Sequence, residues 1–246
     1  GWRGIVVVGL LVVVVYAAVL LLLQKRSGVP YTDIADSEET TRRGVLVPVA
    51  LALALLLVFA VATGRLAEAF VYSPTISSPW LWAVPALIAA GIVARFATTS
   101  WRSLGARRVV VLVVASLLVG VSEELLIRGL FVDVLQDAGL AAVWIAVVSS
   151  IVFGLLHGLN VLLGQPPAAA LLQVVSTTLT GLALFTCLAL SGTLWLPILL
   201  HALFDLSLLA QVAAAGAGQD GAEVRPVQLV LTFVPSLLAI GVLFAL

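Results

Sequence analysis

Two adjacent carboxylates and one guanidinium interrupt an otherwise apolar part of the chain. Glu123, Glu124 and Arg128 lie in the segment SEELLIRGLF, directly after the unbroken apolar run 109–121. A charge near the centre of a bilayer costs about 2.5–3.5 kcal/mol on insertion scales, so ionisable residues at that depth usually mark a functional site. On a helix, Glu124 and Arg128 share a face, while Glu123 lies about 100° around the axis. One carboxylate can therefore pair with Arg128 while the other points elsewhere into a helix bundle.

The chain has two histidines, and both lie within apolar segments. His157 ends the run IVFGLLH, four residues after Phe153, and His201 follows LWLPILL, four residues before Asp205. Residues at this spacing share a helix face. Because polar groups in lipid must find partners inside the protein, we expect the two imidazoles and Asp205 to meet Glu123 between three helices.

The expected cluster can carry out hydrolysis in two ways, and the residues alone leave both open. In one, a carboxylate and a histidine take a proton from water while other polar groups stabilise the oxyanion. In the other, His157, His201 and Glu123 bind Zn²⁺, and metal-bound water attacks, because catalytic zinc sites commonly have three protein ligands and one open position. The sequence contains no HExxH segment and no GxSxG nucleophile elbow.

The composition predicts the fold class. With 63% hydrophobic and 10% charged residues, the chain does not have the composition of a soluble domain. A transmembrane helix needs about 20 mostly apolar residues, and about eight stretches of the chain meet this requirement. We therefore predict an all-α fold, a polytopic transmembrane helix bundle. The predicted spans are 4–23, 44–63, 80–97, 109–136, 140–163, 168–190, 194–212 and 227–246.

The spans are predicted to form one membrane domain over residues 1–246. Its core, 109–209, carries the polar motifs, and 1–108 and 210–246 supply flanking spans. No repeat of 20–50 residues divides the chain.

Polar loops are predicted at 24–43 and 64–79, and the stretch 65–72 of the second loop is predicted to form a short amphipathic helix at the membrane interface. Nine of the twelve basic residues lie in four connections on the same side of the predicted bundle: 24–43, 95–108, 160–167 and 213–226. The positive-inside rule therefore places this side in the cytoplasm. Twelve basic and twelve acidic residues give a net charge of zero, which argues against a nucleic-acid partner.

Three motifs, each on its own predicted span, resemble the CPBP family of CAAX proteases and bacteriocin-processing enzymes, also called the Abi family. They are EExxxR at Glu123, Glu124 and Arg128, FxxxH at Phe153 and His157, and HxxxD at His201 and Asp205. The flanking phrases FGLLHGLN and GTLWLPILLHALFD also resemble bacterial members. The resemblance implies an intramembrane endopeptidase, either a metalloprotease or a glutamate protease, that hydrolyses membrane-associated protein or peptide substrates.

The resemblance also implies roles for the site residues. Glu123 and His157 activate the water, and His201 with Asp205 polarises or holds the scissile carbonyl. Asp205 stands where prenyl-protein endopeptidases have Asn, and three roles stay open for it: a protonated donor, a partner that orients His201, or a metal ligand. The predicted site comprises the catalytic residues Glu123, Glu124, His157, His201 and Asp205, and the supporting residues Arg128, Asn160 and Phe153.

Two other functions remain as alternatives. A proton- or ion-coupled transporter can use the same groups as a relay, although no inverted repeat is visible in the sequence. A non-catalytic protein of the bacteriocin-immunity type can keep the fold and sequester a peptide without turnover. The predicted partners of the protease are membrane lipid and a membrane-anchored or hydrophobic peptide, Zn²⁺ is the cofactor left open, and the predicted location is a bacterial cell membrane, as an integral multi-pass protein.

Overall fold

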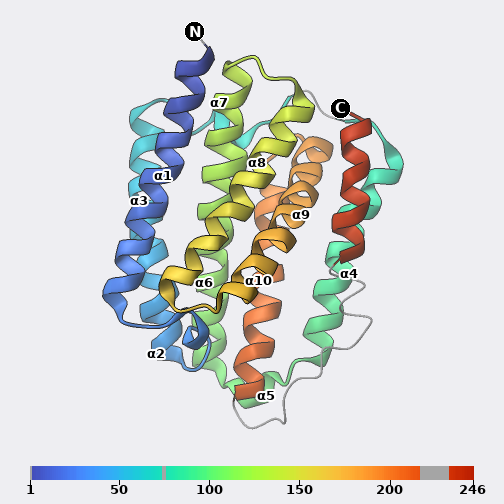
Figure 1. Ribbon diagram of the computed structural model, residues 1–246. Coiled ribbons are helices and arrows are strands. Elements are labelled where there is room, and N and C mark those ends of the chain that lie inside the picture. The colour runs from blue at the N-terminus through green and yellow to red at the C-terminus, as the bar shows by residue number, and fades with distance from the viewer. Residues whose placement is uncertain (1, 74–75, 217–232) are drawn as a thin grey trace.

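A computed structural model describes residues 2–73, 76–216 and 233–246 (Figure 1). Within these residues, seven helical segments are long and apolar enough to cross a membrane, which confirms the predicted all-α transmembrane bundle. The segments are Gly4–Ser27, Glu38–Ala62, Pro79–Thr98, Ala106–Asp137, Ala142–Leu163, Pro167–Ser191 and Trp195–Gly216. The eighth predicted span, 227–246, begins outside the described residues, and its described part contains the shorter apolar helix Phe233–Phe244.

The α-helices follow one another along the chain with short connections. Their bounds are α1 (Trp2–Ser27), α2 (Glu38–Thr41), α3 (Val47–Ala62), α4 (Ala83–Thr98), α5 (Trp101–Leu104), α6 (Ala106–Glu124), α7 (Val132–Asp137), α8 (Ala142–His157), α9 (Pro167–Ser191) and α10 (Trp195–Gly216). Two π-helical segments, Arg42–Leu46 and Leu125–Phe131, join α2 to α3 and α6 to α7. The predicted helix 109–136 is thus one continuous rod that changes its winding near the middle.

Helix α9 and two motif-bearing spans, Ala106–Asp137 and Trp195–Gly216, are the most buried, whereas Ala142–Leu163, which carries His157, is less buried. In α9, 56% of the most apolar 18-residue stretch is buried inside the protein, against 17% in α1. The most extensive pairings are α8 with α9 and α10 with α6, and α6 and α7 run through the centre in Figure 1. Gly120 lies against the Ala202 backbone and Gly154 against Thr178 and the Val174 carbonyl, so that no side chain fits at either glycine. These small residues let the motif helices approach closely, as is common in membrane bundles.

The first polar loop is shorter than the sequence predicts. Helix α1 continues to Ser27, and helix resumes at Glu38, so the connection is 28–37 rather than 24–43. The second helix begins early because the Ser37 side chain accepts from the Thr40 backbone, while the Thr40 hydroxyl accepts from the Ser37 backbone, a capping box. The prediction failed because the last turn of α1 and the first turn of α2 carry charged residues, and such a composition is typical of a loop.

The prediction of an amphipathic helix at 65–72 is wrong. Only Glu68–Phe70 forms a 3-10 turn there, and Val71 pairs with Thr193 in an isolated antiparallel bridge. The segment is held against the α9–α10 connection by backbone hydrogen bonds and against α7 by Arg65, which binds Asp133 and Asp137. The polar residues that suggested an amphipathic face therefore make tertiary contacts.

Candidate active site

The two adjacent glutamates lie where the central helix changes its winding. Glu124 ends α6, and the π-helical segment Leu125–Phe131 follows it directly. Such segments are rare in helices and frequently occur at functional sites. The side chains of the two glutamates diverge from here, Glu124 into the interior and Glu123 toward a cavity.

On the inner side, Glu124 joins two motif helices through one carboxylate oxygen. Its Oε1 accepts from Arg128 Nη1 at 3.0 Å and from His201 Nδ1 at 2.8 Å. Arg128 also donates to the Gly181 carbonyl at 3.0 Å, and its guanidinium lies 4.1 Å from the centre of the Phe153 ring. The Glu124 and Arg128 side chains have no exposed surface, so this pair is a buried ion pair that fixes α6, α9 and α10.

On the cavity side, Glu123 faces both histidines at nearly equal distances. Its Oε2 lies 3.8 Å from His157 Nε2 and 3.9 Å from His201 Nε2. This oxygen is buried and has no hydrogen-bond partner within the described part of the chain. The distances are too long for direct hydrogen bonds, but each lies within reach of one shared water molecule.

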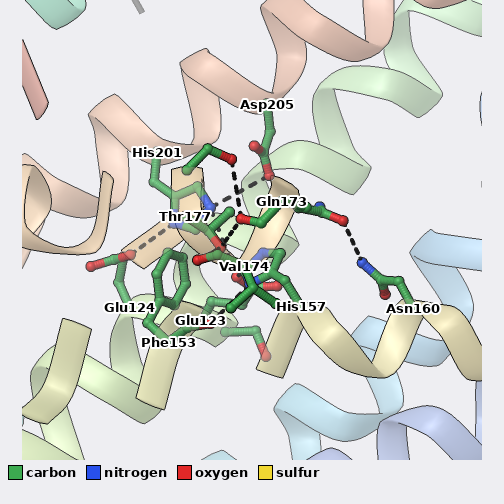
Figure 2. A network of polar contacts seen from close by, with 12 residues as sticks. Glu123, Glu124, Phe153, His157, Asn160, Gln173, Val174, Thr177, His201 and Asp205 are labelled. Atoms are coloured by element: carbon green, nitrogen blue, oxygen red, sulfur yellow. Dashed lines mark hydrogen bonds and ion pairs between the residues drawn. The ribbon is translucent and has the colours of Figure 1, made fainter. Parts of the chain in front are cut away.

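The partners of the histidines fix which nitrogen faces this gap. His157 Nδ1 bonds the Phe153 carbonyl at 2.9 Å, and a carbonyl only accepts, so Nδ1 carries the proton. His201 Nδ1 likewise bonds Glu124, and its Nε2 lies 3.5 Å from Asp205 Oδ2. Both rings therefore present Nε2 toward Glu123, and Figure 2 shows the same convergence.

A cavity of about 520 Å³ adjoins these groups. Glu123, His157 and Asp205 line it, together with apolar side chains of α1, α3, α6 and α10. From there it extends to Tyr31 and Gln165, in the α1–α2 and α8–α9 connections, at the lower end of the bundle in Figure 1. The polar groups are thus reached from a mostly apolar space large enough for several residues of a peptide.

The predicted supporting residues contact the site in different ways. Phe153 packs edge-on against both imidazoles, with ring centres 4.9 Å from His157 and 5.7 Å from His201. Asn160 lines the cavity but bonds Gln173 of α9 at 3.1 Å rather than a motif residue. Phe153 therefore packs directly on the rings, and Asn160 belongs to a second polar group on the wall.

Sequence reasoning missed three polar residues near the cluster: Tyr16, Tyr31 and Gln173, all on the cavity wall. Gln173 bonds Tyr31, and Tyr16 forms a hydrogen bond with Ser122, next to Glu123. Gln173 had a usable signal, because a glutamine inside a predicted span needs an internal partner just as a glutamate does. The tyrosines had none, since an aromatic residue in an apolar helix or a loop is ordinary.

The cluster can be tested against the zinc alternative. Two imidazoles and a carboxylate are suitable zinc ligands, but tetrahedral zinc with bonds of about 2.0–2.1 Å holds its ligand atoms about 3.3–3.4 Å apart. The Glu123-to-histidine distances of 3.8 and 3.9 Å exceed this value. In the described ranges, no three His, Cys, Asp or Glu side chains are spaced to hold a metal ion. Zinc binding stays a prediction, and no step proposed below depends on it.

Fold and site together define a multi-pass helical membrane protein with a glutamate–histidine cluster beside an internal cavity. Comparison with protein families gives a match to the family described as "Type II CAAX prenyl endopeptidase Rce1-like" over residues 105–207. This range contains all three motifs, and the match agrees with their resemblance to the CPBP proteases. No curated protein and no solved structure matches the chain.

Proposed function

We propose that this protein is an intramembrane endopeptidase in which Glu123, assisted by His157, makes water nucleophilic. The observation that carries the proposal is the position of Glu123 Oε2, buried, unpartnered and 3.8–3.9 Å from two imidazole nitrogens at the wall of the cavity. A carboxylate held one water away from a second base is the arrangement that general-base hydrolysis needs. The family match over 105–207 supports the reaction class.

The proposed reaction begins with attack of a water oxygen on the scissile carbonyl carbon, while Glu123 takes the water proton. His201, protonated on both ring nitrogens, donates from Nδ1 to Glu124 and from Nε2 to the oxyanion, and Asp205, 3.5 Å from Nε2, orients the ring. Glu123 then passes its proton to the amide nitrogen, the C–N bond breaks, and a carboxylic acid and an amine leave. Glu124 and Arg128 hold His201 in place and do not touch the substrate.

The proposed substrates are membrane-anchored or hydrophobic peptides: prenylated protein tails of the kind named in the family description, peptide pheromones, bacteriocin leaders or membrane-bound regulators. The apolar walls of the cavity support this class. The cavity extends to the α1–α2 connection, which Lys25 and Arg26 precede and Arg42 and Arg43 follow, so the positive-inside rule favours entry from the cytoplasmic leaflet. A bacterial source stays a prediction.

The test is cleavage by purified protein in lipid vesicles, with a library of apolar peptides analysed by mass spectrometry. Wild type is expected to cleave, and E123Q and H157A are expected to lose activity. E39Q is the matched control, because Glu39 is an exposed residue that binds Arg42 on the surface. Equal cleavage by E123Q and wild type would overturn the proposal.

The same vesicles separate the alternatives. Proton flux that depends on Glu123, without cleavage of any peptide, identifies a transporter. Peptide binding that persists in E123Q and H157A, again without cleavage by wild type, identifies a sequestering protein of the immunity type.

A further inference from the structure

A chain of neutral polar groups crosses the cavity wall beside the catalytic cluster. Asn160, after α8, donates through Nδ2 to Gln173 Oε1 at 3.1 Å, and Gln173 Nε2 donates to the Tyr31 hydroxyl at 2.9 Å. The three residues come from three separate parts of the chain, and all three line the cavity that Glu123 and His157 also line. In Figure 2, Asn160 and Gln173 lie on the side of His157 away from Glu124.

This chain leaves hydrogen-bond donors free. Each amide nitrogen carries two hydrogens and uses one in the chain, and the Tyr31 oxygen accepts from Gln173 while its own hydrogen stays available. Within the described residues, none of these three hydrogens has another partner. Burial raises the pKa of Tyr31 above its ordinary value, so the hydroxyl remains a donor at neutral pH. The mutual bonds hold all three groups in fixed orientations beside the cavity.

The charges around the cavity limit what these donors can bind. Among the described residues that line it, none is Lys or Arg, whereas Glu123 and Asp205 are carboxylates. An anionic group at this wall meets like charge with no lysine or arginine among the described lining residues, which costs binding energy. An uncharged peptide segment instead offers backbone carbonyls, which are acceptors that suit three neutral donors.

We propose that Asn160, Gln173 and Tyr31 form a substrate-positioning site that binds the backbone of an uncharged, internal peptide segment and directs it toward Glu123. The assignment rests on the proposed peptidase function and adds a selection rule to it. Segments that place a carboxylate side chain at this position are disfavoured. The residues position the substrate and take no part in bond breaking.

Equilibrium binding tests this assignment without relying on turnover. The probe is a dye-labelled peptide of 20 Leu, Ala and Ser residues, acetylated and amidated at its ends, and the host protein is E123Q in lipid vesicles. Adding Y31F or Q173L is expected to raise Kd about three- to tenfold, the range for loss of one neutral hydrogen bond. The same peptide with a central Glu is expected to bind H157A, which keeps both Glu123 and Asp205, about tenfold more weakly than the neutral peptide.

Matched variants separate positioning from folding. Y72F makes the same change at a buried tyrosine whose hydroxyl has no partner in the described part of the chain, and Q211L removes a glutamine that bonds Thr98 outside the cavity. Both are expected to leave Kd within about twofold. In the active protein, Y31F is expected to raise KM while kcat changes less than about twofold, and the melting temperature should stay within a few degrees.

The outcomes distinguish this assignment from the proposed function. If wild type cleaves and E123Q does not, yet Y31F and Q173L bind like their parent, the positioning site is refuted and the peptidase stands. If no peptide is cleaved but binding still depends on Tyr31 and Gln173, the peptidase is refuted and the binding site stands. Absence of saturable binding of the neutral peptide, or equal binding of the Glu peptide, also refutes the positioning site.

Discussion

Glu124 and Glu123 are neighbours in one helix, yet their side chains differ in exposure, in hydrogen bonding and in contact with the cavity. Glu124 has no exposed surface, and one oxygen bonds both Arg128 and His201. The Glu123 side chain is 24% exposed, lines a cavity, and its inner oxygen faces His157 and His201 without bonding either. The bonds to Arg128 and His201 hold the Glu124 carboxylate in one position. The Glu123 carboxylate lacks such bonds and can accept and release a proton.

In the proposed mechanism, one of these two adjacent residues has a structural role and the other a chemical role. A buried charge is stable only when it is paired, and the pair then holds its helices in place. A carboxylate that must accept a proton cannot be tied up in such a pair, and it needs access to water. Glu124 and Arg128 thereby fix the position of His201, and in the proposed reaction Glu123 acts beside this histidine.

The largest expected effect comes from E123Q, which keeps the shape of the side chain and removes its basicity. We expect kcat to fall about 10³-fold, within the range for loss of a general base. Because Glu123 Oε2 has no hydrogen bond to lose among the described residues and lies 3.8–3.9 Å from the histidine nitrogens, the melting temperature is expected to change by no more than a few degrees. Peptide cleavage and thermal unfolding in the same vesicles measure both, and a large loss of stability with E123Q would break the comparison.

The opposite pattern is expected on the inner side. R128M leaves Glu124 buried with His201 as its remaining partner, which should lower the free energy of unfolding by about 3–5 kcal/mol. Denaturant unfolding in mixed micelles measures the loss. The double variant R128M/E124Q removes the uncompensated charge and should recover part of it, whereas no recovery would mean that Arg128 acts mainly through its contacts with Phe153 and Gly181.

A smaller effect is expected from D205N. Its side-chain oxygen can still accept from His201, so if Asp205 orients the ring, kcat should fall no more than about tenfold, while D205A should lose about 100-fold. Steady-state cleavage rates decide between the roles. A loss with D205N as large as that with E123Q would show that the charge at 205 takes part in the reaction itself.

The smallest effect concerns a second arginine–carboxylate cluster, near the end of the span Ala106–Asp137. Arg65 binds Asp133 and Asp137, but its side chain is 30% exposed and that of Asp137 is 46% exposed, so water screens the pairs. R65Q should therefore cost only about 1 kcal/mol, and added salt should reduce the difference from wild type. If R65Q lowered the free energy of unfolding as much as R128M does, burial would not explain the difference in stability between the two clusters.

The sequence by itself determined the spans and the motif residues, because both are local properties. An apolar run of about 20 residues crosses a bilayer wherever it occurs, and an ionisable residue within one has few possible reasons to be there. The motif residues that the structure brings together, Glu123, His157, His201 and Asp205, stand out in the sequence for this reason. Their family resemblance follows from the same spacing.

Only the tertiary structure decided that Glu124 also bonds His201, that Glu123 Oε2 lies beside both histidines without a hydrogen bond to either, and that Gln173 and Tyr31 join Asn160 on the cavity wall. These features depend on the rotation of each helix about its axis and on the distance between helices. Those two quantities are set by close packing at Gly120 and Gly154, contacts between segments far apart in the chain that no local pattern records.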